Sequence, residues 1–404
     1  MSVIRPKPPE DPLEYEPAAA GAAAGRPRES LDAVAAGLER ARQDVLGAAA
    51  VAGPDRLLDA YKTRGARGTS ELFAVLQAAV RIRDTVDRVI VLGDGCGPLG
   101  ARAVFESCAH PRHNELSRGD RGGKPRLFFA GSSLDNDALQ GLLDLVAPAG
   151  RPRSGDLLDR WAIVSADTAG DGVGTEAATR LFLAALLESV GGDRAALADR
   201  LASVGVAEGR LAHLATALGC PHVFTIPEHV GAGAAVFTSL ALLPAAVVGI
   251  DIVRLLEGAA AMNRRFREAS AAANPVLTFA AVSSLMAEQG RTARMLASSL
   301  GQLDTVCRWH GRIADRAGPP LVTSLVAREP RRDPLVVPPW PAGVATGERV
   351  DSPAGTAWPD LPAAATPEPP DTDRILLPRV DEHAIGQLLQ FLVLAEGVDA
   401  ARTL

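Results

Sequence analysis

A glycine-rich segment that carries one acid and one thiol follows a short apolar run. The run RVIVL (residues 88–92) leads into Gly93, Asp94, Gly95, Cys96 and Gly97, and a helical pattern follows. A cysteine at a helix N-terminus can have a lowered pKa, although adjacent carboxylates oppose that shift. The glycines also suit a tight strand-to-helix turn that binds nothing. A reactive thiol and a purely structural turn both stay open.

A second loop of glycine and aspartate follows the run WAIVSA (residues 161–166). It contains Asp167 and Asp171, whose carboxylates could bind a cation or face solvent. Together with Asp94 and Cys96, these two aspartates could form an enzymatic site of their own. We expect a solvated turn, and we predict no metal site and no cofactor.

Apolar runs alternate with helical patterns through the first part of the chain. Strands are expected at 88–93, 126–131, 161–166 and 222–226, and helices at 99–108, 135–145 and 175–190. This alternation predicts an α/β fold with a parallel sheet that helices cover on both faces.

The remaining segments predict further helices and a smaller second sheet. Helices are expected at 31–50, capped by Ser30, at 70–83, and over much of 234–299, whereas 293–298, 320–327 and ILLPRV (375–380) suit strands. A capped helix ends the pattern. Residues 1–28 are predicted to be disordered, and the Pro- and Ala-rich residues 328–373 to form a long loop.

Composition narrows the class of protein. The chain has 404 residues, of which 47% are hydrophobic, and a net charge of -6, which argues against a general nucleic-acid binder. Four cysteines without C-x-x-C spacing suit reduced thiols in a cytoplasm. The first residues are unlike a signal peptide, and residues 236–250 contain proline and are too short for a membrane span. We therefore expect a cytoplasmic protein without a membrane partner.

Several long segments resemble the glucose-6-phosphate isomerase family, in a divergent bacterial form. They are VLGDGCGPLGARAVFESC, HPRHNEL, RGGKPRLFFAGSSLDNDALQGLLDL, FTIPEHVG, LLPAAVVGIDIVRLLEGAAAMNRRF and LPRVDEHAIGQLLQFLVLA, and the resemblance spans roughly residues 57–398. It implies two sugar-isomerase domains, each an α/β/α sandwich with a parallel sheet. We expect N-terminal helices and the first domain at 29–260, and a shortened second domain at 261–404.

The resemblance implies an aldose–ketose isomerase that interconverts glucose 6-phosphate and fructose 6-phosphate. Such a site must hold a phosphate, open the sugar ring, move a proton with a carboxylate and stabilise an enediolate with a cation. The family's two phosphate loops align with these positions, which we read as vestigial: Gly93, Gly95, Cys96 and Gly97, then Asp167, Thr168, Gly170, Gly172 and Thr175. The family's lysine is absent, and Asp94, Asp167 and Asp171 place negative charge where a phosphate would sit.

The family's catalytic positions are also replaced. Gly233 stands at the position of the arginine, and Arg316 at that of the glutamate base. About twenty residues that hold the family's histidine are missing before LVTSLVA, and the chain ends before the position of the family's last lysine. His310 and His383 do not align with that histidine, and we expect both to be ordinary histidines of helices.

These substitutions predict a family member that has lost catalysis and binds sugar phosphates weakly or not at all. The alternative is a working sugar-phosphate isomerase that uses substitute residues. We expect a homodimer, or a heteromer with an active isomerase, because family members dimerise. Val248, Ile252, Leu255 and Leu256 could supply the interface, unless they face the protein's own core.

Overall fold

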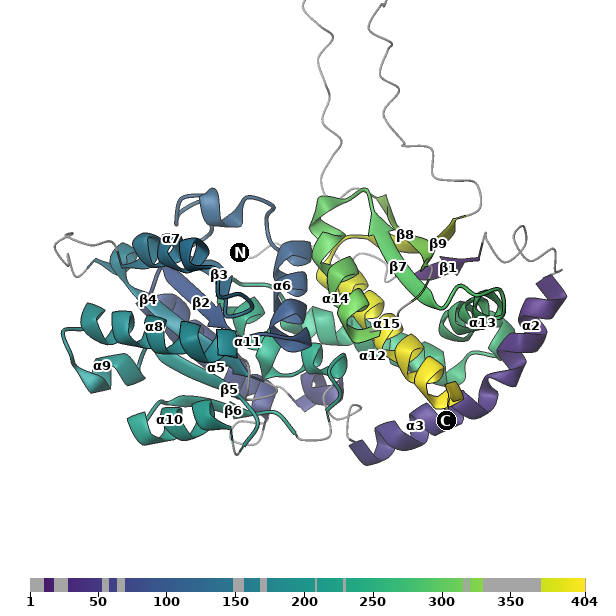
Figure 1. The fold of residues 1–404 in the computed structure, drawn as a ribbon, viewed down its shortest axis with the longest axis horizontal. Coiled ribbons are helices and arrows are strands. Elements are labelled where there is room, and N and C mark those ends of the chain that lie inside the picture. The colour runs from purple at the N-terminus through teal and green to yellow at the C-terminus, as the bar shows by residue number, and fades with distance from the viewer. Residues whose placement is uncertain are drawn as a thin grey trace, which may run out of the picture.

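Two sheets with helices packed around them form the protein (Figure 1). The structure is a computed structural model that describes residues 11–17, 28–52, 58–63, 70–147, 156–167, 173–207, 209–227, 230–314, 318, 320–329 and 372–403. The predicted loop at 328–373 therefore falls almost wholly outside the described residues. The division of the chain at residue 260 stays a prediction.

The first sheet has five strands, all of them parallel. They are β2 (Arg88–Leu92), β3 (Arg126–Ala130), β4 (Trp161–Asp167), β5 (Leu201–Gly205) and β6 (His222–Thr225), in the spatial order β3-β2-β4-β5-β6. Four of these strands were predicted, whereas β5 was missed. Its sequence, LASVG, is rich in small residues of low strand propensity, but all five residues are buried.

Helices cover both faces of this sheet, as the alternation predicted. Side chains of β2 point alternately to two apolar clusters, Val89 and Val91 to one and Ile90 and Leu92 to the other. The first cluster includes α5 (Glu71–Thr85), α6 (Cys96–Cys108) and α11 (Ser239–Val247), and the second includes α7 (Asn136–Val146) and α8 (Val173–Ser189). The short α9 (Arg194–Ala198) and α10 (Arg210–Leu218) complete this half. Helix α5 begins after Ser70, whose hydroxyl accepts a hydrogen bond from Phe73 N at 3.3 Å.

The second sheet has the order β1-β9-β8-β7. Strands β7 (Ala293–Ser298), β8 (Pro320–Glu329) and β9 (Asp373–Arg379) are parallel, and β1 (Glu14–Glu16) pairs with β9 in the antiparallel sense. The prediction of disorder over 1–28 was wrong for β1. A contact with a residue far along the chain holds β1 in place: the buried Tyr15 hydroxyl donates a hydrogen bond to Asp373 Oδ2 at 2.7 Å.

Most of the remaining helices pack around this second sheet. The single helix expected at 31–50 is instead two, α2 (Arg28–Gly37) and α3 (Glu39–Ala52), so Ser30 lies inside α2 and is not its cap. Helices α13 (Pro275–Glu288) and α14 (Asp304–Ala314) follow, and α14 also packs on α6. Through α14 and α6, a single apolar cluster joins both halves of the protein.

Helices α12 (Ile252–Glu268) and α15 (Glu382–Thr403) cross at the centre, where their backbones touch (Figure 1). A Cβ atom at Gly258 would lie 1.9 Å from His383 O, and one at Gly386 would lie 1.9 Å from Leu255 O. Only glycine fits at these two positions.

This crossing also corrects the expected interface. Val248, Ile252, Leu255 and Leu256 are between 0% and 4% exposed within a single chain, so they face the protein's own core and offer no surface to a partner. By length and composition alone, α15 could cross a membrane. However, 72% of its most apolar window is buried inside the fold, as in the core helix of a soluble protein.

A buried carboxylate ties the loop before β3 to the start of β2. Asp87 is 0% exposed, and its Oδ1 accepts hydrogen bonds from Arg118 Nη1 at 2.9 Å and Arg121 Nη2 at 2.6 Å. Arg126 pairs with the other carboxylate oxygen. The remaining guanidinium donors reach backbone carbonyls, among them Arg83 O and Lys124 O. One acid therefore organises three arginines.

We expect Asp87→Asn to lower the free energy of unfolding by about 3–5 kcal/mol, because it leaves buried guanidinium groups without their counter-charge. Asp199→Asn is the matched control: Asp199 pairs with Arg81 on the surface, both side chains are more than half exposed, and its loss should cost under about 1 kcal/mol. Urea denaturation measures both variants. Equal midpoints for the two would contradict a structural role for Asp87.

Candidate functional site

The order of the strands puts a topological switch point at the carboxyl ends of β2 and β4, and we call this place the crevice. From β2 the chain moves outward to β3, and then returns past β2 to β4, so its direction reverses between β2 and β4. Ligands of open α/β sheets bind outside the carboxyl ends of strands at such a reversal. Both predicted phosphate loops leave the sheet here, after Leu92 and after Asp167.

Gly93 lies where the neighbouring strand ends approach most closely. A Cβ atom at Gly93 would lie 1.9 Å from Ala166 O and 2.6 Å from Pro98 Cγ. Gly131, after β3, packs against the Gly93 backbone, and its own Cβ would lie 2.9 Å from Gly93 N. The packing of strand ends therefore requires glycine at position 93 whether or not a ligand binds.

The N-terminus of α6 faces this crevice with its own carboxylate in place. Gly95 is the N-cap with φ 89°, a conformation that favours glycine, and it makes no side-chain cap. Its N–H donates instead to Asp94 Oδ1 at 2.7 Å, while Asp94 itself is exposed. A fixed negative charge thus lies at a helix N-terminus that would otherwise suit an anion.

The second loop is described only at its two ends. Thr168, Gly170, Asp171 and Gly172 lie outside the described residues, and of Asp167 the backbone at the end of β4 is described. Thr175, on α8, is buried and donates its hydroxyl to Gly131 O at 3.3 Å. Its observed task is to fix α8 to the end of β3.

Gly233, which is predicted to align with the family's arginine, lies near the end of α14 among apolar side chains. Gly233 begins the short 3-10 helix Ala234–Phe237 with φ -69°, a conformation open to any residue. A Cβ atom there would lie 3.3 Å from Val393 Cγ2 of α15 and 3.5 Å from Ile313 Cδ1 of α14. Glycine at position 233 therefore supplies no cation, and the side chains next to it are aliphatic.

The end of α14 completes the crevice. Arg316, aligned with the family's glutamate, lies just beyond α14 and outside the described residues. Two residues of the last turn are placed: Ile313 lies beside Gly233, and Arg312 O accepts a weak hydrogen bond from Cys96 Sγ at 3.8 Å. The structure thus brings together Cys96, Gly233 and the end of α14, which lie far apart in the sequence.

Both histidines are confirmed as histidines of helices inside the protein. His310 of α14 is 0% exposed, and its Nε2 lies 3.2 Å from Glu396 Oε1 of α15. His383 is also buried, and its Nδ1 lies 3.2 Å from Gln387 Nε2 one turn later. Each of these two contacts therefore involves a side chain of α15 in the interior of the fold.

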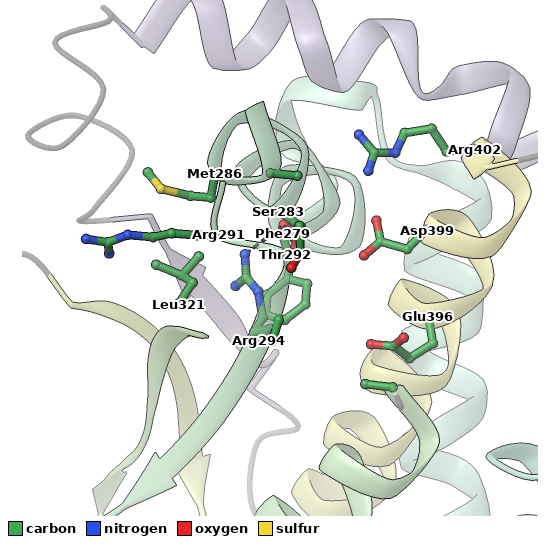
Figure 2. Close-up of a pocket in the computed structure, with 13 residues that line it drawn as sticks. Phe279, Ser283, Met286, Arg291, Thr292, Arg294, Leu321, Glu396, Asp399 and Arg402 are labelled. Atoms are coloured by element: carbon green, nitrogen blue, oxygen red, sulfur yellow. Dashed lines mark hydrogen bonds between the residues drawn. The ribbon is translucent and has the colours of Figure 1, made fainter. Parts of the chain in front are cut away.

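A charged cavity beside the second sheet was not anticipated (Figure 2). Figure 2 shows Arg294 of β7 beside Phe279 of α13, with Glu396 and Asp399 of α15 across the cavity from it. The Arg294 side chain is 7% exposed, stacks 3.7 Å from the centre of the Phe279 ring and donates to Thr323 Oγ1 at 3.0 Å. The cavity holds about 20 Å³, which suits ordered water and excludes a sugar. The signal in the sequence was the acidic pair at positions 396 and 399, which follows the apolar run FLVLA (391–395) of this helix.

Within the described part of the chain, no three His, Cys, Asp or Glu side chains gather in a way that could hold a metal ion. The crevice also contains no described acid–histidine pair. What it offers is a helix N-terminus neutralised by Asp94, a thiol beside a carbonyl, and an aliphatic wall.

Curated proteins are similar to somewhat more than half of the chain. A glucose-6-phosphate isomerase of Symbiobacterium thermophilum is 33% identical over 240 residues, which are 59% of this chain and 50% of that protein. The chain is related to the glucose-6-phosphate isomerases. One from Listeria monocytogenes is 31% identical over 230 residues, which are 56% of this chain and 48% of the relative. The chain spans about half the length of the curated relatives it matches, and no family model matches it.

Solved structures share the fold. A hypothetical protein of Thermus thermophilus superposes with a TM-score of 0.71 at 18% identity, covering 96% of this chain and 94% of that one. A glucose-6-phosphate isomerase of Chlamydia trachomatis superposes with a TM-score of 0.59 at 12% identity, covering 82% of this chain and 68% of that one. The mixed α/β fold with parallel sheets is therefore the fold of these relatives.

Gly93→Ala should destabilise the protein by more than about 2 kcal/mol, because the added methyl group meets a backbone oxygen that cannot move without the sheet. Gly141→Ala in α7 is the control, since a Cβ there meets nothing within 4 Å, and it should stabilise by about 0.5–1 kcal/mol. Thermal unfolding followed by circular dichroism compares them. A Gly93→Ala protein as stable as the parent would overturn the packing argument.

Proposed function

We propose that this protein is a glucose-6-phosphate isomerase homologue that has lost catalysis. One observation carries the proposal: Gly233, which we align with the family's arginine, has no side chain, and the atoms nearest to a Cβ there belong to the aliphatic Val393 and Ile313. A cation at that position would stabilise the enediolate, and loss of one such group typically costs about 2.7–4 kcal/mol of the barrier.

The charge around the crevice supports the same proposal. The Asp94 carboxylate already occupies the N–H of Gly95, so a phosphate dianion would meet a fixed negative charge at the start of α6. We propose that binding of sugar phosphates at this crevice is weak or absent. The protein would then serve through its fold, as a partner or a sensor, in the cytoplasm.

The alternative, a working isomerase with substitute residues, requires a carboxylate and a histidine that reach a sugar. The pair His310 and Glu396 has the right residue types, but His310 is fully buried and Glu396 lines a cavity of about 20 Å³. A sugar phosphate does not fit there, which favours the non-catalytic proposal.

Assembly is the second part of the proposal. Relatedness to the isomerases supports a homodimer, or a heteromer with an active isomerase. Because Val248, Ile252, Leu255 and Leu256 are buried within one chain, an interface has to use other side chains. Exposed apolar side chains occur on α7 and α8, at Leu145 and Leu181, with 45% and 39% exposure.

The purified protein should not convert fructose 6-phosphate to glucose 6-phosphate in a coupled dehydrogenase assay, because the described crevice contains no acid–histidine pair and Gly233 supplies no cation. The Symbiobacterium thermophilum relative serves as the positive control. Gly233→Arg alone should stay inactive, since it restores the cation but not the base. A turnover of about 10 s⁻¹, typical of ordinary enzymes, in the unmodified protein would favour the alternative.

Light scattering at micromolar concentration should give a mass near twice 41.9 kDa, because the proposal keeps the dimer of the isomerase relatives. Replacing both Leu145 and Leu181 by Asn should shift the mass towards 41.9 kDa if α7 and α8 form the interface. A monomer at every concentration would contradict the assembly proposal and leave the catalytic one untouched.

A further inference from the structure

A second cavity, of about 160 Å³, lies between the 3-10 helix η1 (Asp59–Thr63) and helix α12. Its lining shares no residue with the crevice at Gly93. Leu58 and Ala260 give it an apolar wall, and the other lining residues are polar or charged: Asp59, Lys62, Asn263, Arg264 and Arg267. It is eight times larger than the cavity beside Arg294, so it has room for a small molecule.

The cavity residues of α12 share one face of the helix. Ala260, Asn263 and Arg267 follow each other at intervals of three and four, and Arg264 lies beside them, so all four project towards η1. The opposite face of α12, with Leu255 and Met262, is buried in the core. Helix α12, which its close packing on α15 holds in place, therefore forms the rigid wall of the cavity.

The side chains that line this cavity carry a net positive charge, although the whole protein is negatively charged. The lining contains three cations and one carboxylate, a net charge of +2, whereas the whole chain carries -6. Lys62 Nζ lies 2.8 Å from Asp59 Oδ1, and both side chains are about half exposed. Arg264 is exposed and makes no hydrogen bond or ion pair with any described residue. Three like charges around one cavity repel each other, and an anion between them would relieve that repulsion.

The titration of Lys62 reflects the same neighbours. Its hydrogen bond to Asp59 raises the pKa of Lys62, and the positive charge of Arg264 acts in the opposite direction. The positive charges of Arg264 and Lys62, one on each wall, therefore interact across the cavity.

We propose that this cavity binds a phosphate group, with Arg264 and Arg267 as planar donors and Lys62 as a point charge. Guanidinium groups match the oxygens of phosphate in pairs, and the lysine ammonium adds charge without a fixed direction. Asp59 holds Lys62 at the rim. The phosphate can be the free ion or the terminal group of a phosphomonoester, since both present the same oxygens.

Isothermal titration of the full chain at low ionic strength tests the proposal, with inorganic phosphate and glycerol 3-phosphate as separate ligands. We expect saturable binding with one site per chain. Arg264→Gln combined with Arg267→Gln should weaken it at least tenfold, because each lost charge-assisted hydrogen bond is worth about 1.5–3 kcal/mol and about 1.4 kcal/mol is tenfold. Arg180→Gln with Arg210→Gln removes the same charge from exposed positions elsewhere, and should leave the affinity within twofold.

The outcomes separate the two sources of phosphate. Equal affinity for both ligands assigns the free ion or any phosphate end, and tighter binding of glycerol 3-phosphate assigns a monoester. No saturable binding of either ligand, or an equal loss in both double variants, would overturn the proposal. If glucose 6-phosphate still binds to the Arg264→Gln, Arg267→Gln protein, that result would contradict the proposal that the crevice binds sugar phosphates weakly or not at all. The two proposals can therefore fail separately.

Discussion

Helices α12 and α15 cross so closely that a side chain on either crossing glycine would enter the backbone of the other helix. The carbonyl of His383 lies where a Cβ of Gly258 would be, and that of Leu255 where a Cβ of Gly386 would be. From this contact α15 continues past α13, α14 and α3. The positions of several distant features follow: Val393 reaches Gly233, Glu396 reaches His310, and the outer face of α12 is left to line a cavity.

Under the proposed function, the crevice at the ends of β2 and β4 keeps the architecture of the fold and loses the chemistry of the isomerases. The reversal of strand order and the close packing at Gly93 are properties of the backbone, so they persist when side chains are replaced. The electrostatics are properties of a few side chains, and there Asp94 brings an anion and Gly233 removes a cation. A fold can therefore outlast the reaction of its relatives, because packing and catalysis depend on different residues.

Cationic side chains elsewhere in the protein either pair with acids inside the fold or lie at its solvent-exposed surface. Arg118, Arg121 and Arg126 surround Asp87, and Arg294 stacks on Phe279 beside Asp373, so these cations are satisfied by internal partners. The cavity between η1 and α12 differs, because its lining contains three cations and a single carboxylate. That imbalance is what marks this cavity as a place for an anion.

The sequence by itself determined most of the elements, since β-branched runs such as RVIVL and amphipathic repeats carry their own period. It also indicated the isomerase relationship and predicted that Gly233 and Arg316 replace catalytic residues of the family. It could not reveal β5, whose small residues form a strand because they are buried between two neighbours, or β1, which depends on an aspartate 358 residues away. Only the tertiary structure decided that Val248, Ile252, Leu255 and Leu256 face the core, that Val393 and Ile313 lie beside Gly233, and that three cations line one cavity. These facts depend on contacts between segments far apart in the chain, which local propensity does not encode.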